Sequence, residues 1–251
     1  MKLSFMTFVC PEWSIEKVVQ FAKEAGYDGV EIRVDVEHKH GVSSKSSMEE
    51  RKYVKKLFDD KGVEVPCVAT SVQFGYPDPM KRRENVEVAK ANIKLASDLK
   101  AKVVRLFAGG GIKILTEEAA NYIAEAFTEV GDFAMDYGVC PILESSHDII
   151  KSAVEAAEVI KRVKTKNFGV NWNHSDMDQQ TFKLLKNYVR HFHIHKEVFD
   201  PNNTNVLHLA KLMKSINFDG YISLEIIEGH NLPEDLLKET AKRLKGFIAQ
   251  A

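Results

Sequence analysis

Short apolar segments alternate with amphipathic segments from one end of the chain to the other. The apolar segments are either continuous or alternate with polar residues, a pattern typical of buried and half-buried strands. They predict strands at residues 3–8, 29–34, 63–70, 102–107, 139–144, 167–172, 189–195 and 220–226. Each strand is followed by apolar residues at helical spacing, in segments 14–25, 47–61, 79–99, 116–137, 149–163, 177–188, 204–216 and 232–249.

Residues at the predicted helix ends support these boundaries. Ser47 and Glu50 have the spacing of a capping box, and Thr116 precedes two glutamates that suit a helix N-terminus. Three glycines lie where a left-handed residue would end a helix before the next strand: Gly26, Gly62 and Gly138.

The chain has no linker or low-complexity segment, so we predict one domain over residues 1–251. Eight evenly spaced strand–helix units in one domain favour a single (β/α)8 TIM barrel, an α/β fold. Active sites of such barrels lie at the carboxyl ends of the strands, so candidate functional residues are sought there.

Composition narrows the functional class. The 251 residues are 44% hydrophobic and 28% charged, with a formal net charge of −1, and this balance argues against a nucleic-acid or anionic-membrane partner. Residues 2–9 are too short and too polar for a signal core, and no apolar stretch reaches membrane-spanning length. The cysteines lack a Cys-x-x-Cys pair, which favours free thiols in a reducing, cytoplasmic setting; they are Cys10, Cys67 and Cys140.

Four predicted strands end in side chains that bind metals or transfer protons: Glu144, Asn173, His193 and Glu225. If these strands are neighbours in a barrel, the four side chains meet at one end of the sheet. A carboxylate at the end of an apolar strand is expensive to bury unless it is paired or bound to a cation. The alternative is that each glutamate faces solvent or a basic residue.

His193 lies between two further histidines, His191 and His195, in alternating positions of the seventh strand. Alternation places all three on one face, which in a barrel is the interior. Imidazole is a common ligand of divalent metals, so we expect His193 at least to contact metal or substrate.

Arg105 lies within the fourth strand, where an inward guanidinium would bind an anionic or polyhydroxylated ligand or pair with an inward glutamate. Trp13 is an aromatic residue near a strand end and would either wall a pocket or simply pack. Asn173 offers only a neutral oxygen, and His174 and Asp176 in the same loop are substitutes for it. That loop is otherwise an ordinary polar connection.

These segments together resemble the xylose isomerase-like TIM-barrel superfamily of sugar isomerases, epimerases and dehydratases, which also has a DNA-repair endonuclease branch. The resemblance spans nearly the whole chain. It is carried by Trp13, residues 25–31 (Ala-Gly-Tyr-Asp-Gly-Val-Glu), 105–109, 143–144, Asn173, 192–194 and 220–225.

The resemblance implies a divalent ion, Mn²⁺, Mg²⁺, Co²⁺ or Zn²⁺, held by Glu144, Asn173, His193 and Glu225. Glu144 and Glu225 would also be the catalytic pair, moving a proton next to a carbonyl through an enediolate. Two departures affect the metal: Asn173 replaces the family's aspartate, and Asp176 replaces a family histidine that helps to hold substrate. The remaining predicted substrate contacts are Arg105, Trp13, His195 and Lys196.

We therefore predict a metal-dependent isomerase or epimerase of a small sugar, sugar phosphate or sugar acid. Such a protein binds a small carbohydrate, and the family commonly forms homo-oligomers. The alternatives are a sugar or polyol dehydratase on the same site and a non-catalytic barrel that has lost its metal through Asn173. The endonuclease branch fits poorly, because residues 68–73 of the third strand supply no histidine.

Overall fold

The computed structural model describes residues 1–173, 179–200, 202–227 and 231–251. Eight parallel strands close into a barrel in the order β1-β2-β3-β4-β5-β6-β7-β8, and the predicted (β/α)8 fold is confirmed. The strands are β1 Lys2–Met6, β2 Gly29–Arg33, β3 Cys67–Gln73, β4 Val103–Phe107, β5 Cys140–Glu144, β6 Gly169–Trp172, β7 Val189–Ile194 and β8 Tyr221–Leu224.

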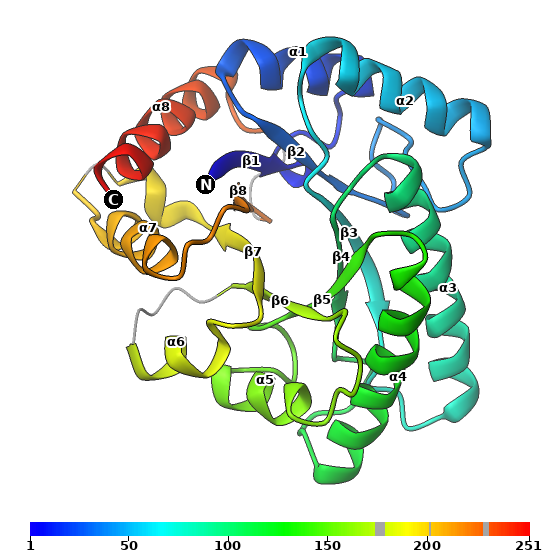
Figure 1. Ribbon diagram of the computed structural model, residues 1–251. Coiled ribbons are helices and arrows are strands. Elements are labelled where there is room, and N and C mark those ends of the chain that lie inside the picture. The colour runs from blue at the N-terminus through cyan, green and yellow to red at the C-terminus, as the bar shows by residue number, and fades with distance from the viewer. Residues whose placement is uncertain (174–178, 201, 228–230) are drawn as a thin grey trace.

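The helices form a ring around the barrel, and α8 lies beside the N-terminal strand (Figure 1). They are α1 Ile15–Ala25, α2 Met48–Lys61, α3 Pro79–Asp98, α4 Glu117–Met135, α5 Ala153–Ile160, α6 Gln179–Leu185, α7 Asn205–Ser215 and α8 Glu234–Gln250. Two short 3₁₀ turns, η1 (Thr7–Val9) and η2 (Lys196–Phe199), follow β1 and β7. None of the described helices is long and apolar enough to cross a membrane.

Local chemistry at the helix ends agrees with the predictions. Ser47 and Glu50 form a complete capping box on α2, and the Thr116 side chain accepts a hydrogen bond from the Ala119 N–H at the start of α4. Gly26 and Gly62 end α1 and α2 in the left-handed conformation. The three cysteines are free.

Two element starts differ most from the prediction, each by four residues. The third strand begins at Cys67 rather than residue 63, because Pro66 has no N–H to donate to a ladder and only an isolated bridge joins Glu64 to Gly29. The fifth helix begins at Ala153 rather than residue 149, because the Ser152 side chain caps it after a bend. Apolar residues continue at regular spacing through the segments just before β3 and α5. The sequence pattern therefore did not reveal where these two elements begin.

The sheet separates two buried regions, one between the strands and the helices and one inside the barrel. The outward strand faces pack under the helices in one large apolar core. Inside the barrel, Cys67, Val103 and Ile142 form a small apolar cluster of their own. The next inward residues on β4 and β5 are Arg105 and Glu144, so the barrel interior becomes charged toward the carboxyl ends of the strands.

Candidate active site at the carboxyl ends of the strands

His193 lies at the centre of a buried group of charged side chains inside the barrel. Its Nε2 atom is 3.0 Å from Oε2 and 3.2 Å from Oε1 of Glu31 on β2. Its Nδ1 atom is 3.1 Å from Glu225 Oε2 and 3.9 Å from Glu144 Oε2. All four side chains are buried. One imidazole therefore connects a carboxylate within the barrel to two carboxylates at the ends of β5 and β8.

Glu31 also holds His191, two residues before His193 on β7. The His191 Nε2 atom is 2.9 Å from Glu31 Oε2, and the two imidazole rings are nearly perpendicular at 84°. One potential ligand atom from each of Glu31, His191 and His193 lies within 4.8 Å of the other two, so these residues form a candidate metal site.

Asn171 on β6 joins the group from the opposite side. Its Nδ2 atom donates a hydrogen bond to Glu144 Oε1 at 2.9 Å and is also 2.9 Å from His193 Nδ1. Its buried Oδ1 atom has no hydrogen-bond partner among the described residues. His193 Nδ1 thus faces an amide donor and the Glu225 carboxylate at nearly the same distance.

Asn173 lies just beyond the end of β6. Its backbone N–H donates to Ser145 Oγ at 3.2 Å, and its Nδ2 atom donates to the Ser146 carbonyl at 3.4 Å. Its Oδ1 atom is buried and has no hydrogen-bond partner in the described part of the chain. An unsatisfied buried oxygen costs free energy, so Asn173 is suited to offer that oxygen to a ligand.

The charges in this group separate the pKa values of the two strand-end glutamates. Burial raises the pKa of Glu144 to about 7; His193 and Arg105 oppose the shift, and Glu225 and Glu31 add to it. Burial alone would also raise the pKa of Glu225, but His193 and His195 hold it below its usual range. One carboxyl is therefore ionised where the other retains a share of its proton, as a proton-transfer pair requires.

The pKa values of His191 and His193 are also shifted in opposite directions. Burial alone would lower the pKa of His193, but the carboxylates of Glu225 and Glu31 raise it well above the usual value. Burial lowers the pKa of His191, although Glu31 opposes the shift. His191 is thus a neutral ring whose Nε2–H donates to Glu31.

Arg105 adds a buried positive charge beside the glutamates. Its Nε atom is 3.4 Å from Glu144 Oε2, and its guanidinium carbon lies 4.1 Å from the centre of the Phe107 ring. The predicted alternatives for this residue, a glutamate pair and a ligand contact, are compatible, because the ion pair leaves other nitrogen atoms unoccupied.

A largely apolar pocket of about 420 Å³ opens beside Glu225. His195 lines it, and the His195 Nε2 atom is 3.2 Å from Glu225 Oε2. Its other lining residues are Lys196, Phe199, Ile226, Ile227 and Leu232. The pocket gives a small molecule a place next to one of the two strand-end carboxylates.

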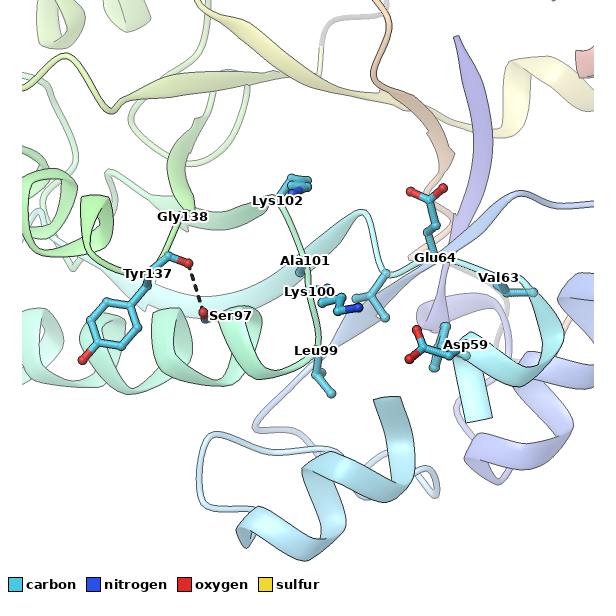
Figure 2. A pocket seen from close by; sticks show the side chains of 12 residues that line it. Asp59, Val63, Glu64, Ser97, Leu99, Lys100, Ala101, Lys102, Tyr137 and Gly138 are labelled. Atoms are coloured by element: carbon cyan, nitrogen blue, oxygen red, sulfur yellow. Dashed lines mark hydrogen bonds between the residues drawn. The ribbon is translucent and has the colours of Figure 1, made fainter. Parts of the chain in front are cut away.

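A second cleft lies at the opposite end of the barrel, among the loops that precede β3, β4 and β5 (Figure 2). Asp59, Glu64, Lys100 and Lys102 line it. Ser97 and Tyr137 also line it, and the Ser97 hydroxyl donates to the Tyr137 carbonyl at 3.0 Å. Barrel enzymes place their chemistry at the other end, and the buried acid–base group lies there too.

The structure brings most of the predicted site residues together. Glu144, His193, Glu225 and Arg105 form one contact group, and His195 adjoins it through Glu225. Lys196 lines the adjacent pocket.

Trp13 is not part of this contact group. It packs edge-on against Phe21 of α1, and Lys17 Nζ lies 4.3 Å from the centre of its ring. The predicted substrate contact of Trp13 stays a prediction. Asp176 and His174 lie outside the described residues.

Sequence reasoning missed Glu31 and Asn171 as site residues. Glu31 belongs to a strand 160 residues before His191, so only closure of the barrel reveals their contact. Asn171 lies on β6 two residues before Asn173, and strand alternation could therefore have indicated that its side chain points to the same side as that of Asn173.

Known structures of similar shape include several sugar-modifying enzymes. An L-ribulose 3-epimerase is 17% identical, with a TM-score of 0.82 over 99% of this chain and 93% of the other. The IolI protein with a bound zinc atom is 19% identical, with a TM-score of 0.81 over 100% and 99%. The probable 3-DHS dehydratase AsbF from Bacillus anthracis is 18% identical, with a TM-score of 0.75 over 98% and 99%.

At these identities the likeness shows the fold. A search of curated protein sequences finds no match. The family profile for the xylose isomerase-like TIM barrel matches residues 19–247, which is most of the chain and includes every described residue of the buried acid–base group. The chain therefore belongs to the xylose isomerase-like TIM-barrel family.

Proposed function

We propose that the protein is a divalent-metal-dependent isomerase or epimerase of a small sugar, sugar phosphate or sugar acid. The observation that carries this proposal is the arrangement of His193, with one nitrogen against Glu31 and the other facing Glu144 and Glu225. A metal-binding histidine typically has its second nitrogen held by a carboxylate, which orients the ring.

The metal ligands would be Glu144, His193 Nδ1 and Glu225, with Asn173 offering its unpaired Oδ1. This mixture of carboxylate, imidazole and amide donors suits Mn²⁺, Co²⁺ or Zn²⁺ and also admits Mg²⁺. The ion would act as a Lewis acid on a substrate carbonyl.

The trio of Glu31, His191 and His193 is the competing ligand set. In it, both Nε2 atoms already lie within hydrogen-bond distance of Glu31, and all three side chains are almost fully buried. A catalytic metal keeps a position open to substrate, and this trio has protein on every side. We therefore assign Glu31 and His191 to positioning His193.

Glu225 and Glu144 would carry the proton in turn. Glu225, which is ionised beside His193 and His195, would accept the proton from the carbon next to the carbonyl. Glu144, at the end of β5, would return a proton to the enediolate. Return to the other face of the same carbon gives epimerisation, and return to the neighbouring carbon gives isomerisation.

Mn²⁺ binding to chelator-treated protein, measured by titration calorimetry, tests the ligand assignment. Stoichiometric binding should disappear in Glu225→Ala and survive, weakened, in His191→Gln. The reverse pattern would place the metal on the Glu31 trio. Absence of binding to the wild-type protein would leave a non-catalytic barrel as the better account.

Solvent-proton exchange tests the reaction. A ketose or sugar acid incubated in deuterated water with Mn²⁺ and wild-type protein should gain deuterium next to its carbonyl, and Glu225→Gln should abolish the gain. A product lighter by one water molecule would instead identify a dehydratase.

A further inference from the structure

Two buried arginines flank one small residue at the mouth of the barrel. In the parallel ladders, Arg33 of β2 and Arg105 of β4 are both in register with Ala69 of β3. Glu31 and Arg105 point inward, as their contacts to His193 and Glu144 show, so Arg33 and Ala69 share that face. Neighbouring strands are about 4.8 Å apart, which places the two arginine backbones roughly 10 Å from each other.

Arg105 is only partly satisfied by protein. It is 1% exposed, and its Nη1 atom has no hydrogen-bond partner among the described residues. Its remaining polar contact is the 3.4 Å approach of Nε to Glu144, and Phe107 supports one face of the guanidinium. A buried guanidinium with an empty donor is costly, which indicates that a ligand completes it.

Arg33 is a fixed charge on the other side of Ala69. Its Nη1 atom donates to the carbonyls of Val34 and Ala69 at 2.8 and 3.2 Å, and its Nη2 atom bonds Ser71. Its buried Nε atom has no partner in the described chain. The strand ends thus hold this arginine in place with one donor left over.

The charge balance of the site points the same way. Glu144 is the carboxylate that now offsets Arg105. If Glu144 and Glu225 are committed to a divalent cation, Arg105 loses the compensation that Glu144 now provides. An anionic group on the substrate would restore the balance, and the planar fork of arginine matches carboxylate and phosphate oxygens.

We infer that the substrate carries an anionic group, a carboxylate or a phosphate, which binds Arg105 and lies between it and Arg33 above Ala69. This inference rests on the proposed function and narrows its substrate to acidic sugars. It places the anionic end of the substrate near β2–β4 and leaves the rest to reach Glu144 and Glu225.

Binding of matched sugars tests the inference without requiring turnover. D-glucose, D-glucuronate and D-glucose 6-phosphate are titrated calorimetrically into wild-type protein, both with Mn²⁺ and after chelation. We expect at least one acidic sugar to bind about tenfold or more tightly than glucose and to lose that preference in high salt. The tighter of the two acids identifies the carboxylate or the phosphate as the anion.

The variants locate the site. Arg105→Gln should remove the preference, and Arg105→Lys should reduce it, because a lysine keeps the charge but loses the fork. Ala69→Asp would place a carboxylate between the arginines and should block acidic sugars even if the Arg105 variants fail to fold. Arg83→Gln, on the exposed face of α3, is the matched control and should change nothing.

Equal binding of glucose and both acids to the wild-type protein would overturn the inference. So would an acidic preference that persists in folded Arg105→Gln and Ala69→Asp. Because the preference is also measured without metal, a failure of the Mn²⁺ site remains distinguishable from a failure of the anion site.

Discussion

The two ends of the barrel use similar charged side chains at very different depths. At the amino ends of the strands, Lys2 pairs with Glu64 beside the cleft in Figure 2, and these side chains are 46% and 58% exposed. At the carboxyl ends, the side chains of His193 and Glu31 pair with no exposure at all. Solvent therefore screens the first pair and leaves the second to interact at full strength.

This difference explains why one end is suited to chemistry. Exposed ion pairs contribute about 0–1 kcal/mol. Burial instead moves the pKa of Glu144 to about 7 while neighbouring histidines hold that of Glu225 low. Acid–base catalysis needs groups whose pKa values are separated in this way, and the buried end provides them.

The largest expected effect comes from Glu31→Gln. This change replaces the carboxylate shared by His191 and His193 with a neutral amide, so the two buried imidazoles lose the negative charge that holds them and have one acceptor oxygen in place of two. We expect the free energy of unfolding in urea at neutral pH to fall by about 3–5 kcal/mol. A loss of less than about 1 kcal/mol would mean that this buried pair is no stronger than the exposed one.

His40 offers a second test, because it is a buried histidine at the same end that has no carboxylate partner in the described residues. Burial, with a smaller contribution from His38, lowers its pKa from 6.5 to about 4. Between pH 6.5 and 4, His40 is therefore mostly protonated in the unfolded chain and mostly neutral in the folded chain. The free energy of unfolding consequently decreases as the pH falls through this range. The loss from this group is about 3 kcal/mol, at 1.36 kcal/mol per pKa unit.

Urea unfolding of the wild-type protein and of His40→Gln across this pH range measures that loss. The difference in stability between the two should shrink or reverse toward pH 4, because the variant has no group to protonate at this position. His208→Asn, on the exposed side of α7, is the matched control. Parallel stability curves for wild type and His40→Gln would contradict the expectation.

Asn173→Asp tests whether Asn173 belongs to the proposed metal site at the buried end of the barrel. The change converts an unpaired amide oxygen into a carboxylate beside the proposed ligands. We expect Mn²⁺ to bind about tenfold more tightly, or about 1.4 kcal/mol, because an added negative ligand raises the affinity for a cation. Asn202→Asp on an exposed turn should leave the titration unchanged, and an unchanged affinity in Asn173→Asp would remove Asn173 from the ligand set.

The smallest effect is expected at the exposed end. Glu64→Gln removes the partner of Lys2 where solvent already screens both groups. The free energy of unfolding should change by less than about 1 kcal/mol, and this change should disappear at high salt. A larger loss would indicate that the cleft in Figure 2 has a structural role beyond its exposed ion pairs.

Local features of the fold were predictable because they depend on neighbours in sequence. The capping box at Ser47 and Glu50 and the left-handed glycines Gly26 and Gly62 are decided within one turn of helix. The start of β3 was mispredicted because Pro66 interrupts the ladder inside an apolar run. Alternation along β7 correctly placed His191 and His193 inside the barrel.

By itself, the sequence determined eight strand–helix units, their order, and the strand-end positions of Glu144, His193 and Glu225, because hydrophobic periodicity and strand alternation are properties of the local chain. The tertiary structure alone decided that Glu31 reaches His193 across the barrel and that Arg33 and Arg105 flank Ala69. It also decided how the pKa values of Glu144 and Glu225 separate. These outcomes depend on burial and on contacts between distant residues, which arise only when the sheet closes.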